Sequence, residues 1–316
     1  MPSRRSRVAA TMTMAMTRAE PTDAGLVLAP GSRIGIIAGG GSLPVEVAAG
    51  LAAHGHPPFI LLLEGEADRL QDLLVYDHDK LALEQIGSLV PVLKRHGISH
   101  VILAGEIKRR PRLTDIRPSL GLLAILPSVI MALARGDDGL LKIVTRGLEK
   151  RGIKVIGAHQ AVPELAAGQG TLTAAKPIQS DWRDIEAGRT AAKAIGALDI
   201  GQAAIAIGGR VIALEGIEGT AELIARTAQL RTHGRIAGKT RGVVVKCAKP
   251  GQELRADLPS IGPQTVEAAH AAGLAGIAVE AGRSLILEGP ATIARANALG
   301  LFIVGLPAAT EPANGR

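Results

Sequence analysis

The stretch from Lys246 to Thr265 is the part of the chain richest in groups that can do chemistry. It reads KCAKPGQELRADLPSIGPQT and follows the apolar run 243–245, so we expect a long loop between a strand and a helix, where catalytic groups are often placed. A phosphoryl-transfer site needs cations to neutralise developing charge and a carboxylate to hold a metal ion or align water, and this segment holds both kinds of group together with two glycines. The mixture suits phosphoryl transfer, although a solvated loop with a turn fits the same spacing.

A glycine run followed by serine, Gly39-Gly40-Gly41-Ser42, comes directly after the apolar segment 34–38 and opens a predicted helix. Glycine lets the backbone approach a ligand, and free amides at a helix start bind anions, so these four residues are candidate phosphate or nucleotide contacts. The dinucleotide fingerprint G-x-G-x-x-G is incomplete, because Pro44 stands at its third glycine. Glu64 could still act as a ribose acceptor. NAD binding is therefore a weaker hypothesis, and a tight strand-to-helix turn without a ligand is the structural interpretation.

Two further acidic turns have ambiguous roles. Glu215 and Glu218 lie in EGIEGT, just before a predicted helix, and could help to bind a divalent cation or could only stabilise the helix dipole. Asp137 and Asp138 present the same choice, with helix capping favoured.

Composition and missing motifs exclude several classes of protein. Aromatic residues make up 1% of the chain, which argues against a stacking platform for single-stranded nucleic acid. The single cysteine, Cys247, rules out an internal disulfide and follows an apolar run, so we expect a buried, inert thiol. The eight histidines show no metal-ligand spacing, and neither a P-loop nor a G-x-S-x-G motif is present. A net charge of +7 fits either a solvated basic surface or attraction to phosphates or an anionic membrane.

Alternating short apolar runs and helical stretches predict an α/β protein with a Rossmann-like parallel sheet in its first half. The expected strands are 34–38, 59–63, 100–104 and 154–157, and the expected helices are 43–54, 79–96, 120–133 and 139–151. A break in the pattern over 168–182 predicts a domain junction. We therefore expect an extension at 1–32 that is disordered, an N-terminal domain at 33–167 and a C-terminal catalytic domain at 168–316.

The second half predicts a mixed sheet, because hairpins alternate with helices. Expected helices are 180–198, 219–230, 263–272 and 290–299, with strands at 242–247 and 301–304. Hairpins are expected at 203–214, around Gly208-Gly209, and at 275–287, around Gly282-Arg283. No apolar segment reaches the length of a membrane helix, and the first residues do not resemble a signal peptide, so a cytoplasmic location is predicted.

Five segments together resemble the UDP-2,3-diacylglucosamine pyrophosphatases of the LpxI type. They are IGIIAGGGSLP (34–44), AGEIKR (104–109), VIALEGIEGT (211–220), GVVVKCAKPGQELRADLPSIGPQT (242–265) and GLAGIAVEAGRSLIL (273–287). The resemblance runs from about residue 33 to 307 and implies two domains, a lipid nucleotide bound between them and Mg2+-dependent hydrolysis in lipid A synthesis. It also implies that Asp257, in DLPSIGP, is essential.

From this resemblance we expect water to attack one phosphorus, with Asp257 holding the metal or deprotonating the water. Expected substrate or phosphate contacts are Lys246, Lys249, Gln264, Thr265 and the segment Gly39–Ser42, and Glu215 and Glu218 are further metal candidates. The expected partners are the UDP-linked diacylated glucosamine lipid, the surface of the inner membrane and a second copy of the chain; no nucleic acid is expected. A dinucleotide-dependent oxidoreductase and a non-catalytic nucleotide-sugar or membrane-binding protein remain alternatives.

Overall fold

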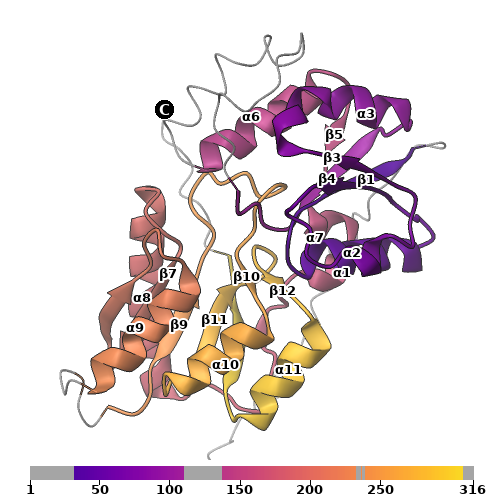
Figure 1. Ribbon diagram of the computed structural model, residues 1–316. Coiled ribbons are helices and arrows are strands. Elements are labelled where there is room, and N and C mark those ends of the chain that lie inside the picture. The colour runs from indigo at the N-terminus through magenta and orange to yellow at the C-terminus, as the bar shows by residue number, and fades with distance from the viewer. Residues whose placement is uncertain (1–31, 110–136, 233–235, 237–238, 309–316) are drawn as a thin grey trace, which may run out of the picture.

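The chain folds into two α/β lobes, and the first lies above the second in the computed structural model of Figure 1. The structure describes residues 32–109, 137–232, 236 and 239–308. The predicted helix at 120–133, the extension before residue 32 and the side chains of Asp137 and Asp138 lie outside this description.

The first lobe is built on a five-stranded parallel sheet in the order β3-β2-β1-β4-β5. The strands are β1 (Ile34–Ala38), β2 (Phe59–Leu63), β3 (His78–Leu81), β4 (His100–Ala104) and β5 (Lys154–Val155). The central strands β1 and β2 are buried along their whole length, which explains their unbroken apolar sequences. Because the chain runs from β1 outward to β3 and then returns to β4, the sheet has a topological switch point between β1 and β4.

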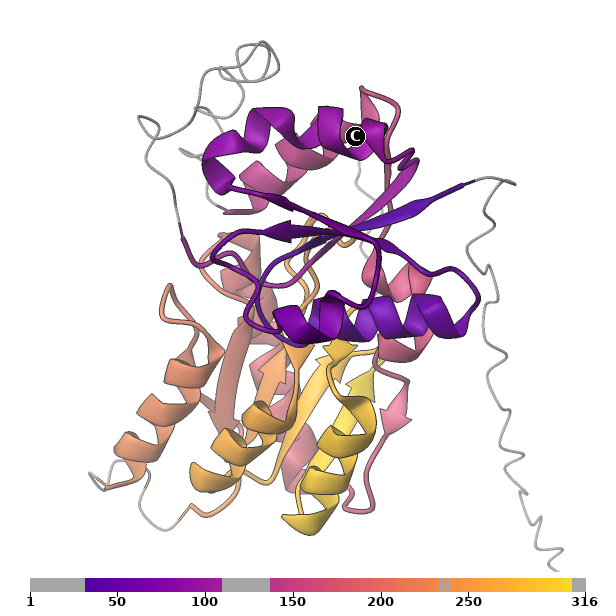
Figure 2. The same ribbon diagram turned by 45° about the vertical axis from the view of Figure 1, so that its right-hand side comes forward.

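Helices cover both faces of this sheet, as Figure 2 shows edge-on. One apolar core joins α1 (Leu43–Ala53), α2 (Leu70–Leu73) and α7 (Ala158–Ala161) to one face, and a second joins α3 (Leu89–Arg95) and α6 (Asp137–Glu149) to the other. Short 3-10 turns, η1 (Leu83–Ser88) and η2 (Pro163–Leu165), complete the lobe.

The second lobe contains a six-stranded mixed sheet in the order β6-β13-β11-β9-β7-β8. Its strands are β6 (Gly170–Thr171), β7 (Ala203–Ile207), β8 (Arg210–Leu214), β9 (Val243–Lys246), β11 (Gly276–Glu280) and β13 (Phe302–Leu306). Strands β9, β11 and β13 are parallel, whereas β6, β7 and β8 each pair with a neighbour in antiparallel fashion. The predicted architecture, a parallel sheet followed by a mixed sheet, is confirmed, and so is the hairpin at 203–214.

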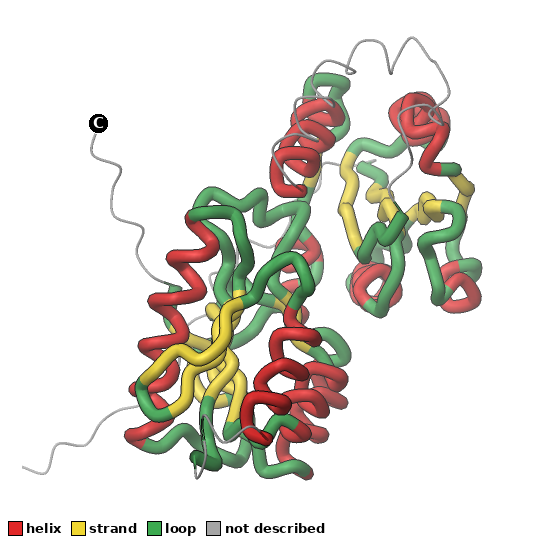
Figure 3. Tube along the Cα trace, turned by 60° about the vertical axis from the view of Figure 1, so that its left-hand side comes forward, coloured by secondary structure: helices red, strands yellow, loops and turns green. Residues whose placement is uncertain are grey.

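The long helix α8 (Gln179–Ala197) packs on one face of the second sheet and three helices pack on the other. Those three are α9 (Thr220–Thr232), α10 (Pro263–Ala271) and α11 (Gly289–Ala298). Figure 3 shows this second lobe separated from the first by a region of loops. Among the described residues, no helix is long and apolar enough to cross a membrane.

A small third sheet lies between the lobes and contradicts the predicted hairpin at 275–287. Strand β12 (Leu285–Ile286) pairs in parallel with β10 (Ser260–Ile261) instead of folding back on β11. Leu285 belongs to the apolar core of the first lobe, and Leu258 and Leu287 pack against it. The hairpin prediction is wrong because the apolar partner of Leu285 is in the other lobe, which local spacing does not reveal.

The predicted long helix at 79–96 is also wrong in its first part. Residues 78–81 form the edge strand β3, whose outer positions are polar because a single neighbour, β2, pairs with it. A 3-10 turn and the short helix α3 follow. The charged composition of an edge strand resembles that of a helix start, so the sequence alone misplaced it.

The backbone of β13 packs closely against Gly168, at the start of the second lobe, and we therefore expect Gly305→Ala to destabilise the protein. A Cβ on Gly305 would lie 1.8 Å from the carbonyl oxygen of Gly168, so β13 and the chain at 168 would have to separate. We expect the free energy of unfolding in urea to fall by at least ~1–3 kcal/mol. Gly289→Ala is the matched control, because a Cβ on Gly289 meets no atom within 4 Å. Equal urea midpoints for the two variants would contradict this packing.

Candidate active site

The site forms where the carboxyl ends of strands from both lobes come together. Lys246 is the last residue of β9 and is buried, and its ammonium group donates to the carbonyl oxygen of Ser260 at 3.0 Å. Burial lowers the pKa of Lys246, while the nearby carboxylates of Glu215, Asp257 and Glu106 act to raise it. Glu106 follows β4 of the first lobe. Acidic groups from both lobes therefore act on this buried lysine and offset part of the effect of burial, although its pKa stays below the ordinary value.

Asp257 lies on an exposed turn that is held by its own loop. The amide of Asp257 donates to the carbonyl oxygen of Glu253 at 3.0 Å, and its Oδ2 accepts a bond from the Nε2 of Gln252 at 2.7 Å. Gln252 is buried, and its Oε1 accepts the amide of Lys249 at 2.9 Å. Gln252 therefore joins the start and the end of the loop and fixes the orientation of the Asp257 carboxylate. Nothing in the sequence distinguishes this glutamine from an ordinary loop residue.

Two other predicted residues of this segment, Lys249 and Thr265, have structural contacts. The ammonium of Lys249 pairs with Asp199 at 2.7 Å. Thr265 Oγ1 accepts the amide of Gly262 at 3.3 Å, as a residue of the first turn of α10, and Gln264 is exposed beside it. The structure thus brings Lys246 close to Asp257 and Glu215, while Lys249 is paired elsewhere. Phosphate contacts for Lys249, Gln264 and Thr265 stay predictions.

The glycine run at the end of β1 uses its amides within the protein. The amides of Gly39 and Gly40 donate to the carbonyl oxygens of Ala104 and Glu106, both at 2.8 Å. The amide of Gly41 donates to the carboxylate of Asp68 at 2.9 Å, and this bond lowers the pKa of that carboxyl. The Ser42 hydroxyl donates to Glu46 at 2.8 Å.

These contacts support the structural interpretation of residues 39–42 and give no support to their predicted phosphate contacts. Glycine is required there because a Cβ on Gly39 would lie 2.4 Å from the Glu106 carbonyl oxygen, and one on Gly105 would lie 2.5 Å from the Gly40 oxygen. A phosphate could reach the Gly41 amide only by displacing Asp68. The turns after β1 and β4 are therefore hydrogen-bonded to each other at the switch point of the sheet.

These hydrogen-bonded turns position Glu106, which the sequence analysis did not single out. The carboxylate of Glu66, whose side chain is 1% exposed, accepts the amides of Lys108 at 2.6 Å and Arg109 at 3.2 Å. Backbone bonds to Gly40 hold Glu106 on its other side. Glu106 was visible as the exposed acid of the AGEIKR segment, but its place beside Lys246 depends on how the lobes dock.

The structure gives Glu215 and Glu218 roles other than the metal binding proposed for them. Glu215 is buried, with Oε2 accepting the amide of Gln202 at 2.7 Å and Oε1 accepting the hydroxyl of Thr220 at 2.5 Å. Glu218 forms an ion pair with Arg226 at 3.1 Å. Since each oxygen of Glu215 accepts a hydrogen bond, this residue braces the turn between β8 and α9; metal binding by Glu215 and Glu218 stays a prediction.

A closed metal cage is absent from the described part of the chain. No group of three His, Cys, Asp or Glu side chains there could hold a metal ion. Mg2+ is usually bound by one or two carboxylates together with substrate phosphates, so this finding does not conflict with a magnesium ion that arrives with its substrate. Asp257 and Glu106, two exposed carboxylates that both act on Lys246, have the oxygen donors that such an ion requires.

Comparison with known proteins identifies the family. Residues 33–165 match the family model of the LpxI N-terminal domain, and residues 168–304 match that of the LpxI C-terminal domain. The chain belongs to the LpxI family. One relative in Caulobacter vibrioides, described as UDP-2,3-diacylglucosamine pyrophosphatase LpxI, is 39% identical over 282 residues, which cover 89% of this chain and 99% of that protein. A solved chain, CobK precorrin-6A reductase, aligns over 90% of both chains at 14% identity, with a TM-score of 0.29.

The LpxI-family chain has one cysteine, and we expect it to be unreactive in the folded protein. Cys247 is 1% exposed and burial raises the pKa of its thiol to about 12, so almost no thiolate exists at pH 8. A colorimetric disulfide reagent should therefore titrate no thiol in the native protein at pH 8 and one thiol per chain in concentrated urea. Rapid reaction of the native protein would show that β9 opens readily or that the thiol is not buried.

Proposed function

We propose that this protein hydrolyses the pyrophosphate bond of UDP-2,3-diacylglucosamine, giving UMP and 2,3-diacylglucosamine 1-phosphate. Membership of the LpxI family through both domains supports the reaction and substrate, as does the name of the Caulobacter relative. The observation that carries the proposal is the meeting of Lys246, Asp257 and Glu106 at the junction of the lobes. A cation with two carboxylates acting on it supports the proposal, because transfer of a charged phosphoryl group requires such groups.

In the proposed reaction, Asp257 orients a water molecule and accepts its proton as the water oxygen forms a bond to one phosphorus. The bond from that phosphorus to the bridging oxygen breaks, and UMP or the sugar phosphate leaves. The exposed carboxylate has access to water, and Gln252 restricts its rotation through the bond to Oδ2. Lys246 donates to a phosphate oxygen and offsets the charge that develops during attack. Its ammonium already lies at the carboxyl edge of the sheet, and the bond to the Ser260 carbonyl uses one of its three protons.

Magnesium remains part of the proposal: Glu106 would hold it against the substrate, and holding the metal is the alternative role of Asp257 to deprotonating the water. A bound Mg2+ would draw negative charge from the phosphate oxygens and lower the barrier to attack. Glu215 and Glu218 stay predicted ligands, although their carboxylates also contact Gln202, Thr220 and Arg226.

The location of the protein, its contact with a membrane and its oligomeric state are also proposals. A diacylated substrate is expected to reside in a membrane, so we propose that the protein works in the cytoplasm and contacts the inner membrane surface transiently. Assembly as a homodimer stays a prediction, which light scattering on the purified protein would test. The oxidoreductase alternative finds no support in the structure, since the amides of the glycine run are engaged and the buried Pro44 replaces the glycine that a dinucleotide needs.

Replacing the proposed catalytic carboxylate tests the assignment directly. Asp257→Asn keeps the side-chain volume but removes the base, so we expect kcat for UMP release to fall by at least ~10²-fold. UMP formation from UDP-2,3-diacylglucosamine would be followed with Mg2+ and with EDTA, and EDTA should stop turnover by the wild type.

Asp72→Asn provides the matched control, because Asp72 is an exposed carboxylate in the first lobe that pairs with Arg69 at 3.0 Å. No UMP from the wild type would overturn the proposed activity. Near-normal turnover by Asp257→Asn would leave the activity standing and remove Asp257 from the mechanism, and full activity in EDTA would remove magnesium.

A further inference from the structure

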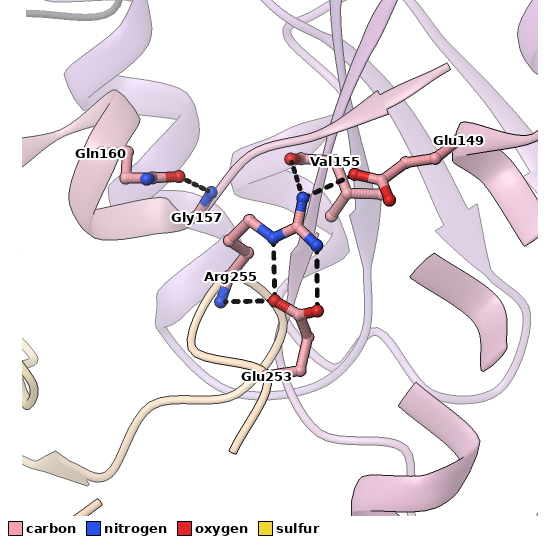
Figure 4. Close-up of polar contacts among 6 residues, drawn as sticks. All are labelled: Glu149, Val155, Gly157, Gln160, Glu253 and Arg255. Carbon is pink, nitrogen blue, oxygen red and sulfur yellow. Dashed lines mark hydrogen bonds and ion pairs between the residues drawn. The ribbon is translucent and has the colours of Figure 1, made fainter. Parts of the chain in front are cut away.

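Arg255 connects the loop of Asp257 to the other lobe, as Figure 4 shows. Its Nε and NH2 donate to the two carboxylate oxygens of Glu253 at 2.8 and 2.9 Å. Its NH1 donates to Glu149, at the end of α6, at 2.5 Å and lies 3.4 Å from the carbonyl oxygen of Val155 in β5. One planar guanidinium therefore holds its own loop by a two-point fork and the first lobe by its remaining nitrogen.

This fork and Asp257 share an anchor. The carbonyl oxygen of Glu253 accepts the amides of Ala256 at 2.9 Å and Asp257 at 3.0 Å, which makes residues 253–257 one tight turn. The carboxylate of Glu253 is held by Arg255, and this bond lowers the pKa of Glu253. The Arg255 fork therefore holds the same residue, Glu253, to which the backbone of Asp257 is bonded.

The contact is also closely packed on the side of the first lobe. A Cβ on Gly157 would lie 3.3 Å from the Cα of Arg255, so the turn sits against the backbone that follows β5. The side chains of Arg255 and Glu149 are 31% and 35% exposed, so the ion pair is partly shielded from solvent. Partly shielded, charge-assisted pairs restrain geometry better than exposed ones.

We propose that Arg255 is a positioning residue, which sets the place of Asp257 at the reaction centre by tying its turn to Glu149 and Val155 of the first lobe. This inference rests on the proposed hydrolysis at Asp257. It means that the base reaches its working position only when the lobes are docked, because the two halves of the Arg255 contact belong to different lobes. A misplacement of about 1 Å in a reacting group can cost ~10²-fold in rate.

The test compares Arg255→Lys and Glu149→Gln with the wild type. Lysine keeps the charge but cannot form the fork, and glutamine leaves the Glu253–Arg255 fork intact while weakening the contact between lobes. We expect kcat for UMP release to fall ~10–10²-fold in Arg255→Lys and several-fold in Glu149→Gln, with little change in KM. Hydrogen exchange at the Asp257 amide should become faster in both variants.

Arg295→Lys is the matched control. Arg295 makes the same two-point fork to Glu267, at 2.6 and 3.0 Å, but joins α11 to α10 within one lobe. The melting temperature of the Arg295→Lys variant should match that of Arg255→Lys, and its kcat should equal that of the wild type.

Three results would overturn the inference: equal kcat in Arg255→Lys and Arg295→Lys, wild-type turnover in Glu149→Gln, or unchanged exchange at the Asp257 amide. Loss of kcat in Glu149→Gln with an unchanged melting temperature supports it even if Arg255→Lys folds poorly. A wild type that releases no UMP would count against the proposed function, and the exchange measurement would then still decide whether Arg255 positions the turn.

Discussion

An ammonium group buried at the junction of two lobes has to be compensated electrostatically, and much of the site follows from how this is done for Lys246. An unpaired charge in such a place costs several kcal/mol, so the chain supplies carboxylates from Glu106, Glu215 and Asp257. Two of these three acids stay exposed, while Glu215 is buried and committed to the protein. The same arrangement that makes a buried lysine tolerable leaves exposed oxygen donors beside a cation, which is what a phosphate-processing site requires.

The docking of the lobes is sustained by contacts that lie close to this site. Apolar side chains at Leu258 and Leu285 enter the core of the first lobe, and the amide of Glu288 donates to Glu46 at 2.7 Å. The Arg255 contact adds a charged tie next to Asp257. The segment between β9 and α10 is attached to the second lobe at both ends and contacts the first lobe in between, through Arg255 and Leu258, so the fold itself brings the two sheet edges together.

Local patterns predicted the individual elements of the fold well. Buried runs such as 34–38 and 243–246 are strands because both sheet faces are covered, and the Gly208-Gly209 hairpin formed as its turn chemistry indicates. The errors occurred where the partner is distant or the strand is polar. Strand β12 is directed by Leu285 toward the other lobe, and β3 resembles a helix start because it pairs on one side.

The candidate site was predicted only in part, because some of its contacts also join residues that are distant in the sequence. Lys246 stood out by its charge in a polar segment and Asp257 through the family resemblance, whereas Glu106 and Gln252 owe their roles to tertiary contacts. The glycine run appeared suited to phosphate, but its amides turned out to serve the adjacent turn and Asp68. The most direct test of a site shared by both lobes is a crystal structure of Asp257→Asn with UDP-2,3-diacylglucosamine bound. We predict that the pyrophosphate lies between the lobes within hydrogen-bonding distance of Lys246; a pyrophosphate seated on residues 39–42 with Asp68 displaced would contradict the account.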